Sequence, residues 1–120
     1  MEEDKLNKLL KVSAIRKQTE FKQVFSSGTK MFSNYFNLYY SNYPMLCLGI
    51  QINKRIIPTA VKRNYLRRLV REHVRLAQHQ LPKMKLVFSG KREASTATKE
   101  ELHQCLEKFI NVLINQYKKV

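Results

Sequence analysis

The spacing of apolar residues along this chain alternates between a period of two and a period of three to four. Apolar side chains recur at every second position over 31–40 and 46–53, which predicts two β-strands. They recur at helical spacing over 66–77 and 102–117, which predicts two long amphipathic helices. A shorter helix is expected over 19–28, where Thr19 is a candidate N-cap and Gly28 follows the last apolar position.

Each predicted strand has one strongly apolar face and one face of aromatic, polar or small side chains. The apolar faces carry Phe32, Phe36, Leu38 and Tyr40 in the first strand and Leu46, Leu48, Ile50 and Ile52 in the second. We expect the strands to pair as a hairpin, because the connection at Asn42-Tyr43-Pro44 is short. The other face is either a half-exposed sheet surface or a platform for unpaired bases, and it presents Tyr35, Asn37, Tyr39, Gln51 and Asn53.

The first long helix is expected to begin after Pro58-Thr59, with Thr59 as a candidate cap, and to end near Leu81-Pro82. Its apolar stripe consists of Leu66, Leu69, Val70, His73 and Ala77. A short strand is expected over 85–89. Thr98 and Glu101 have the spacing of a capping box, which marks the start of the last helix. The stripe of that helix is assigned to the core and comprises Leu102, Cys105, Leu106, Phe109, Ile110, Leu113 and Tyr117.

The elements follow one another as helix, two or three strands, helix, strand and helix. This order predicts an α+β single-domain sandwich over 1–120, with a small sheet and helices on one side. Residues 1–18 have mixed charge and no clear apolar stripe, so we expect them to form a mobile N-terminal arm.

The charge of the chain is its strongest indication of function, because the 120 residues carry a formal net charge of +14. Such a balance implies a polyanionic partner, either nucleic acid or an anionic membrane surface. The cations concentrate in one segment, which holds a single acid, Glu72, among Lys54, Arg55, Lys62, Arg63, Arg67, Arg68, Arg71 and Arg75.

Four of these arginines, Arg63, Arg67, Arg71 and Arg75, recur at every fourth position. On a helix they repel one another by about 0.2–0.5 kcal/mol per pair, so a polyanion against that face would relieve the repulsion. The pattern therefore favours a helix that docks on nucleic acid, and a solvated basic face is the alternative. Asn64 lies among them and either contacts a base or ribose or braces a neighbouring side chain.

Several other functions are disfavoured by the sequence. No apolar run approaches the length of a membrane span, and the N-terminal residues contain no apolar signal-peptide core, so we expect a cytoplasmic protein of bacterial type or a nuclear protein. Cys47 and Cys105 are far apart among apolar neighbours, which favours buried thiols over a disulfide or a metal site. No paired carboxylates, activated nucleophile or glycine-rich phosphate loop is found, which suggests that the protein binds and positions while another component performs the chemistry.

Four segments of the chain, in order, resemble the bacterial ribonuclease P protein component. The most specific is AVKRNYLRRLVRE at 60–72, which is similar to the signature helix of that family. The others are EFKQVF at 20–25, similar to its short helix, FNLY at 36–39, similar to its first strand, and GIQINKR at 49–55, similar to the strand that ends in a basic pair.

The resemblance implies a protein that binds a catalytic RNA and the 5′ leader of precursor tRNA while the RNA, using magnesium, removes the leader. By position, the surface facing the catalytic RNA would comprise Arg63, Asn64, Arg67, Arg68, Arg71 and Arg75. The leader-binding cleft would comprise Phe21, Phe25, Tyr39, Lys54 and Arg55. Phe36 matches an aromatic position of the cleft but lies on the core-like strand face, so we interpret it as structural. The resemblance further implies a left-handed strand–helix–strand crossover, a bacterial cytoplasmic location and no obligate protein partner.

The chain departs from the family pattern at two positions that bear on the site. Tyr65 stands where an arginine is common, and Lys85 stands where an acidic residue usually begins the last strand. A metal or turn role at position 85 is therefore not carried over. Two other classes remain as alternatives, a structural RNA-binding protein of the ribosomal type and a sequence-specific DNA-binding protein. The strands preceding the basic helix argue against the latter.

Overall fold

A computed structural model of the chain describes residues 13–15 and 18–118. Nine elements follow one another along it: β1 (Ser13–Ala14), α2 (Gln18–Ser27), β2 (Thr29–Phe32), β3 (Phe36–Asn42), β4 (Cys47–Gln51), α3 (Ala60–Ala77), β5 (Met84–Gly90), the 3₁₀ helix η1 (Arg92–Ser95) and α4 (Lys99–Lys118). The α+β class and the order of the elements are as predicted. Of the arm expected over 1–18, residues 1–12, 16 and 17 lie outside the described residues, whereas Ser13-Ala14 and the buried Ile15 belong to the fold.

The five strands form one sheet in the order β1-β4-β5-β3-β2. The predicted hairpin of β3 with β4 is wrong, because β5 lies between them and pairs antiparallel with β3 and parallel with β4. A short connection permits a hairpin but does not require one, and β5 offers both neighbours a central strand that is buried along most of its length. Helix α3 links the parallel neighbours β4 and β5, which is the crossover whose left hand the resemblance implies.

The continuous strand predicted over 31–40 is in fact two strands joined by a tight turn. The hydroxyl of Ser33 donates to the carbonyl of Phe36 at 2.6 Å and accepts from the backbone N–H of Phe36 at 3.1 Å, which closes the turn. This break moves two side chains away from their predicted faces. Phe32 is 65% exposed rather than part of the core, and Tyr35 packs against the main core instead of joining Asn37 and Tyr39.

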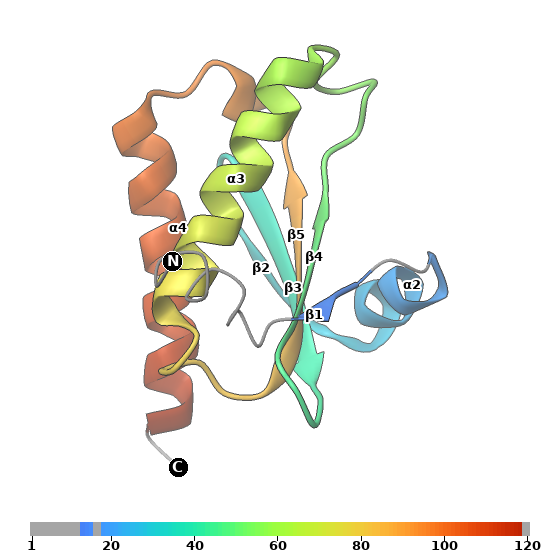
Figure 1. Ribbon diagram of the computed structural model, residues 1–120, viewed down its shortest axis with the longest axis vertical. Coiled ribbons are helices and arrows are strands. Elements are labelled where there is room, and N and C mark those ends of the chain that lie inside the picture. Colours follow the sequence, from blue (N-terminus) through green and yellow to red (C-terminus); the bar gives the residue numbers. More distant parts are fainter. Residues whose placement is uncertain (1–12, 16–17, 119–120) are drawn as a thin grey trace, which may run out of the picture.

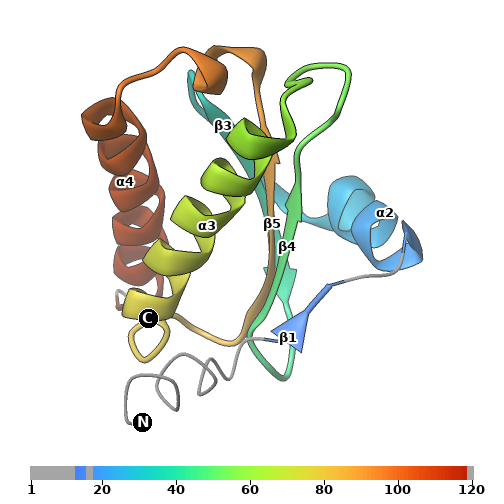
Figure 2. The same cartoon turned by 45° about the horizontal axis from the view of Figure 1, so that its top comes forward.

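The two long helices, α3 and α4, cover one face of the sheet, as expected for helices on one side (Figure 1). The short helix α2 packs on the opposite face, so the prediction of helices on one side holds for the two long helices but not for α2 (Figures 1 and 2). The main core lies between the sheet and the two long helices and includes Phe36, Leu38, Leu66, Phe88 and Leu106. A smaller apolar cluster lies under α2 and contains Ile15, Val24, Cys47 and Val87.

The predicted helix boundaries hold with small shifts. Helix α2 begins at Gln18, so Thr19 lies inside it, and Thr59 occupies the N-cap position of α3 without a side-chain capping bond. Helix α3 ends at Ala77, before the expected Leu81-Pro82. The capping box is present, since Thr98 and Glu101 exchange hydrogen bonds of 2.8 and 3.2 Å between side chains and backbone N–H groups.

Gly28 ends α2 at a point where only glycine fits. A Cβ atom there would lie 2.5 Å from the carbonyl oxygen of Val24 and 2.7 Å from that of Tyr40. The chain therefore passes from α2 into β2 with its backbone against β3, and this close approach fixes α2 on the sheet.

Candidate nucleic-acid interface

Helix α3 carries five arginines along its solvent side, which we call the arginine strip: Arg63, Arg67, Arg68, Arg71 and Arg75. The buried residues of α3 are Leu66, Leu69, Val70, Val74 and Ala77. At 100° of rotation per residue, Arg63 and Arg67 lie at the margin of this buried stripe, whereas Arg68 and Arg75 lie on the opposite side of the helix. His73, predicted in the stripe, is only half-buried, and Val74 takes its place. The strip faces the β4 edge of the sheet, since Arg67 and Arg71 line a hollow with Ala14, Ile15, Leu48 and Ile50.

The arginines of the strip differ in what they already contact. The Nη1 of Arg63 donates to the carbonyl oxygens of Ile57 at 2.9 Å and Pro58 at 2.8 Å, so Arg63 holds the turn that leads into α3. Arg67 donates to the Oδ1 of Asn64 at 3.3 Å, which is the bracing role that was one of two readings of Asn64.

Arg75 forms an ion pair with Glu72, one turn before it on the helix. Arg68 and Arg71 are exposed. The strip therefore combines braced guanidiniums with exposed ones, and the exposed ones are free to meet a polyanion.

The second group of predicted site residues lies on the far face of the sheet. Phe25 meets Tyr39 edge-on with ring centroids 4.6 Å apart, and Phe21 lies 6.4 Å from Phe25. Phe21 packs on Gly49, where a Cβ atom would lie 2.8 Å from its ring. The structure thus brings together the three aromatic residues that the sequence assigned to a cleft, and we call them the aromatic cluster.

The two surfaces meet at the β1–β4 edge. Ile15, immediately after β1, lines the hollow beside Arg67 and Arg71 and also belongs to the apolar cluster against which Phe21 packs. The arginine strip and the aromatic cluster are therefore neighbours around one edge of the sheet, although they lie on opposite faces.

The basic pair Lys54 and Arg55 is exposed in the turn that follows β4. Asn53 organises this turn, because its side-chain oxygen accepts from the N–H of Arg55 at 2.7 Å and its carbonyl accepts from the N–H of Ile57 at 2.9 Å. None of the described contacts joins Lys54 or Arg55 to the aromatic cluster. Strand β4 connects the two regions, because Phe21 packs on Gly49 in the middle of β4 and the basic pair follows the end of that strand.

Two residues beside Tyr39 were missed by sequence reasoning. Lys30 lies opposite Tyr39 on β2 and places its ammonium 6.0 Å from the ring centroid, and Phe32 lies 6.5 Å from the same ring, edge-on. Only the pairing of β2 with β3 could have found them, and that pairing was hidden by the assumption of a single strand.

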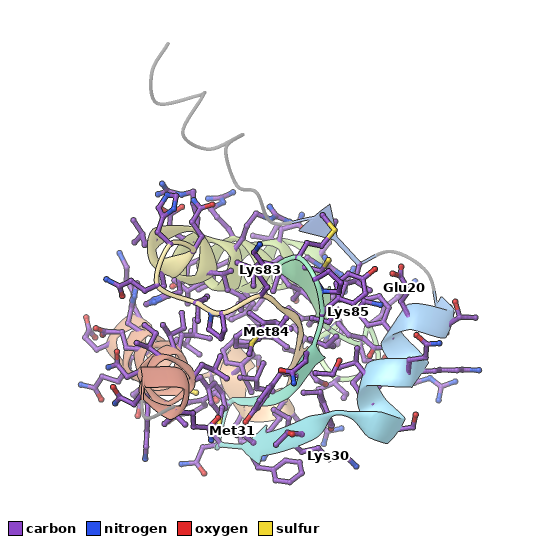
Figure 3. All side chains as sticks on the ribbon, turned by 90° about the horizontal axis from the view of Figure 1, so that it is seen from below. Glu20, Lys30, Met31, Lys83, Met84 and Lys85 are labelled. Atoms are coloured by element: carbon purple, nitrogen blue, oxygen red, sulfur yellow. The ribbon has the colours of Figure 1, made fainter. Side chains whose placement is uncertain are left out.

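Lys85 is buried in the same face of the sheet, below the aromatic cluster. Figure 3 shows its side chain directed towards α2, where its ammonium lies 3.5 Å from a carboxylate oxygen of Glu20. The ammonium also lies 4.2 Å from the ring centroid of Tyr43. The buried ammonium of Lys85 is thus accommodated by an ion pair to α2 and an aromatic ring.

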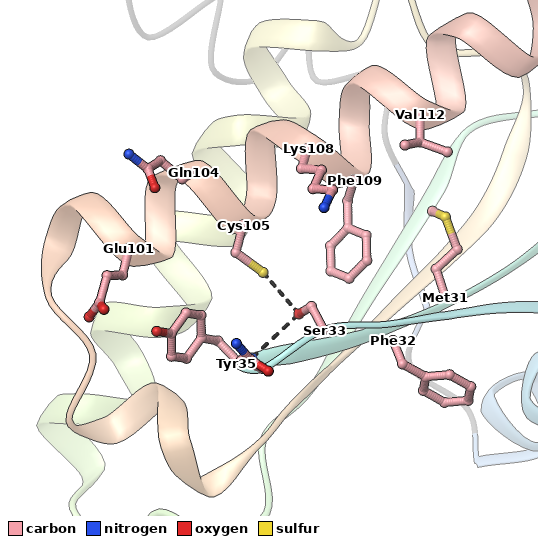
Figure 4. A pocket seen from close by; sticks show the side chains of 11 residues that line it. Met31, Phe32, Ser33, Tyr35, Glu101, Gln104, Cys105, Lys108, Phe109 and Val112 are labelled. Carbon is pink, nitrogen blue, oxygen red and sulfur yellow. Dashed lines mark hydrogen bonds between the residues drawn. The ribbon is translucent and has the colours of Figure 1, made fainter.

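Both cysteines are free thiols, Cys47 buried and Cys105 partly buried. Burial raises the pKa of Cys47, and the nearby Lys85 opposes that shift. The Sγ of Cys105 lies 3.0 Å from the hydroxyl of Ser33 inside a hollow between the β2–β3 turn and α4 (Figure 4). Cys47 therefore packs in the apolar cluster under α2, and Cys105 contacts the hydroxyl of the β2–β3 turn.

Two histidines that showed no common spacing in the sequence are partners in the structure. The Nε2 of His73 on α3 and the Nδ1 of His103 on α4 are 2.7 Å apart, in hydrogen-bonding contact. Burial, and then the neighbouring His103, lower the pKa of His73. Among the described residues, no group of three or more His, Cys, Asp or Glu side chains could hold a metal ion.

No helix in the described part of the chain is long and apolar enough to cross a membrane.

Comparison with known proteins places this arrangement in a family. The model of the family described as ribonuclease P matches residues 9–113. Among curated proteins, the chain is 31% identical to the ribonuclease P protein component of Coxiella burnetii, with 88% of each chain covered. It is 38% identical to that of Nitrosococcus oceani, with 81% of this chain and 83% of the relative covered.

The fold has counterparts among solved structures. The ribonuclease P protein of Staphylococcus aureus superimposes with a TM-score of 0.78 at 22% identity, covering 85% of this chain and 95% of that one. The protein from Thermotoga maritima gives a TM-score of 0.70 at 25% identity, with 86% and 96% covered. By the family match and the extent of the curated similarity, the chain belongs to the ribonuclease P protein component family.

Proposed function

We propose that this protein binds the catalytic RNA of ribonuclease P through the arginine strip of α3 and the 5′ leader of precursor tRNA through the aromatic cluster. In this proposal the two RNAs approach opposite faces of the sheet near the β1–β4 edge. The holoenzyme would then act as a magnesium-dependent endoribonuclease in the bacterial cytoplasm, removing the leader during tRNA maturation.

The arginine strip supports the first half of the proposal by its charge and chemistry. Arg68 and Arg71 are exposed, and their guanidiniums offer the planar fork of donors that fits phosphate oxygens. Arg63 and Arg67 are held by backbone carbonyls and by Asn64, so less side-chain freedom is lost when they meet a phosphate. The single observation that carries this half is that α3 holds five arginines and only one acid, Glu72.

The aromatic cluster supports the second half. Phe21, Phe25 and Tyr39 are partly buried rings around one patch of the sheet, flanked by the ammonium of Lys30. Bases of single-stranded RNA stack on such rings, and each base contributes about 1–3 kcal/mol. Stacking is tolerant of sequence, which suits a leader that differs from one tRNA to another.

The chemistry is assigned to the RNA and its magnesium ions. In this proposal the RNA performs the hydrolysis, and no step of it is assigned to a side chain of this protein. What the protein would supply is affinity, by neutralising phosphates and holding the leader in line with the cleavage site.

A reconstitution assay tests the proposal. The protein is combined with a bacterial ribonuclease P RNA at low magnesium, and 5′ processing of a precursor tRNA is followed. We expect stimulation over the RNA alone and no cleavage by the protein alone. Robust cleavage by protein alone would contradict the assignment of the chemistry. Salt-sensitive RNA binding without stimulation, together with co-purification with ribosomal subunits, would instead support a structural RNA-binding protein.

A further inference from the structure

The surface that we assign to the leader contains one acid. Helix α2 and the five strands, all within the described residues, hold a single acidic side chain, that of Glu20. Glu20 directly precedes Phe21, whose ring packs on Gly49 in the aromatic cluster. Because consecutive Cα atoms are about 3.8 Å apart, a phosphate held beside that ring comes within the Debye length of about 8–10 Å from position 20. An unpaired carboxylate at this position would repel the phosphate.

The carboxylate of Glu20 is paired from the sheet side by Lys85. Lys85 on β5 lies opposite Cys47 on β4 and Ser41 on β3, and its side chain is only 9% exposed. Its Nζ lies 3.5 Å from a carboxylate oxygen of Glu20, whose side chain is 33% exposed (Figure 3). The ring of Tyr43, with its centroid 4.2 Å from the ammonium, helps to hold the lysine in place. The buried lysine is therefore the fixed partner, and the pairing directs the carboxylate towards the sheet.

The arginine strip pairs its own acid in the same way. Glu72, the only acid of α3, forms an ion pair with Arg75. Two ion pairs are found among the described residues, and each joins the acid of one proposed RNA surface to a cation of the same protein. Arg75 belongs to the strip itself, whereas Lys85 is buried and out of reach of a phosphate. The charge of Lys85 therefore acts on bound RNA through its effect on Glu20.

We propose that Lys85 is a positioning residue for precursor tRNA, whose buried ammonium holds and neutralises the carboxylate of Glu20 so that this acid does not repel the phosphates of the leader. The inference rests on the proposed function, because it concerns the surface that we assign to the leader. In the alternative, purely structural role, the ion pair only stabilises the packing of α2 on the sheet. The two roles differ in what removal of Glu20 does. Neutralisation makes its removal harmless to leader binding, whereas a structural pair is lost with either partner.

The test measures the affinity of the holoenzyme for precursor tRNA and for mature tRNA, because the ratio of the two isolates the contribution of the leader. Lys85→Met leaves the carboxylate of Glu20 unpaired, and the ratio should fall about fivefold. Glu20→Gln should keep the ratio within about twofold or raise it, although the protein should unfold more readily. The double variant should recover the ratio to within about twofold of the unaltered value, since neither charge is then present.

A matched control separates the pairing from the loss of one positive charge. Lys83→Met removes the same charge two residues earlier, from an exposed side chain that lies farther from α2 than Lys85 does (Figure 3). It should change the ratio by no more than about twofold. The fall caused by Lys85→Met should also shrink as monovalent salt rises above about 0.1 M, because screening weakens the repulsion between exposed charges. Affinity for the catalytic RNA should be the same for all these variants.

Stability is measured alongside affinity, by chemical denaturation of each free protein. Lys85→Gln, which keeps a polar side chain without the charge, replaces Lys85→Met if that variant does not fold, and the same fall in the ratio is expected. A neutralising role predicts that stability and leader affinity change in opposite directions for Glu20→Gln. A structural role predicts that they fall together.

Three results would overturn the inference: an unchanged ratio for Lys85→Met, an equal fall for Lys83→Met, or an equal fall for Glu20→Gln that the double variant does not reverse. The last of these would leave the ion pair with a structural role alone. Tyr39→Ala distinguishes such a failure from failure of the proposed function. If Tyr39→Ala lowers the ratio, the leader assignment stands whatever Lys85 does, and if it leaves the ratio unchanged, the leader assignment itself is wrong.

Discussion

The ring of Phe21 occupies the space above Gly49, so that a Cβ atom at position 49 would lie 2.8 Å from its Cε1 and 3.1 Å from the Cβ of Ile15. The absence of a side chain at Gly49 therefore leaves room for the Phe21 ring of α2 to pack on the strand. The helix and the sheet are locked together at the residue that we place at the centre of the leader surface.

Replacing Gly49 with alanine should therefore damage the leader surface more than the fold. The new methyl group displaces the Phe21 ring, which is partly exposed and can swing outwards. We expect the affinity of the holoenzyme for precursor tRNA to fall at least fivefold, about 1 kcal/mol, while affinity for the catalytic RNA is unchanged. Gly90→Ala is the matched control, since its Cβ would meet only Ile52, at 3.1 Å. Unchanged precursor binding by Gly49→Ala would show that the position of Phe21 is unimportant.

The parts of this fold that could be predicted are those determined by residues close together in the sequence. The helices, the capping box of Thr98 and Glu101, and the strand over 85–89 follow from spacing and composition within a few residues, and the structure confirms them. The pairing of strands is not local. The alternation over 31–40 is interrupted at Asn34, beside the turn at Ser33, but one polar residue in an alternating pattern does not show that the chain reverses there.

The same distinction applies to the candidate site. Arg63, Arg67 and Arg71 are four residues apart on one helix, so sequence alone places them together. Lys30 and Phe32 approach Tyr39 from the neighbouring strand, and His73 contacts His103, 30 residues further along the chain, from another helix. Such groups are visible only once the strand order and helix packing are known.

The arginine strip predicts a graded response to charge removal. Arg68→Ala and Arg71→Ala remove exposed guanidiniums, and each should reduce the slope of log affinity against log salt for the catalytic RNA by about 0.7–0.9 per lost phosphate contact. Lys108→Ala on α4 removes an exposed charge away from the strip and serves as the control. Equal slopes for all three variants would place the catalytic RNA on another surface.

Arg63→Ala should behave differently, because Arg63 also holds the turn before α3 through the carbonyls of Ile57 and Pro58. We expect it to lower the free energy of unfolding by about 1–2 kcal/mol, whereas Arg68→Ala should leave it within about 0.5 kcal/mol. Chemical denaturation of the free protein measures both. A stable Arg63→Ala protein would mean that these hydrogen bonds add little to the fold.

The ion pair of Lys85 with Glu20 predicts an asymmetry between its two partners. Glu20→Gln leaves a buried ammonium without its carboxylate and should lower the free energy of unfolding by about 1–2 kcal/mol, between the values for exposed and for buried pairs. Lys85→Met replaces the ammonium with an apolar group of similar length and should be neutral or stabilising. Denaturant unfolding of both variants, and of the double variant, gives the coupling. Equal losses from both single variants would contradict this account.

The contact between His73 and His103 predicts a dependence of stability on pH. Burial and the neighbouring imidazole lower the pKa of His73 in the folded protein, and Glu107 and Glu72 oppose that shift without reversing it. Above about pH 6.5, the ordinary value for histidine, His73 is neutral in both folded and unfolded states and contributes no pH dependence. As the pH falls below that value, His73 becomes protonated in the unfolded chain but stays neutral in the folded protein, where its pKa is lower. The unfolded state then binds more protons, so the free energy of unfolding falls as the pH is lowered, until the pH reaches the lowered pKa of the folded state.

Denaturant unfolding between pH 5 and pH 8 should show this fall for the unaltered protein and a flatter profile for His73→Gln, which cannot be protonated. His79→Gln is the matched control, since His79 is exposed in the turn after α3 and should leave the profile as it is. Identical profiles for the two variants would mean that the imidazole of His73 is as readily protonated in the folded protein as in the unfolded chain. A profile that rises towards low pH would mean that Glu72 and Glu107 outweigh burial, and that α3 and α4 are joined by a charged rather than a neutral pair.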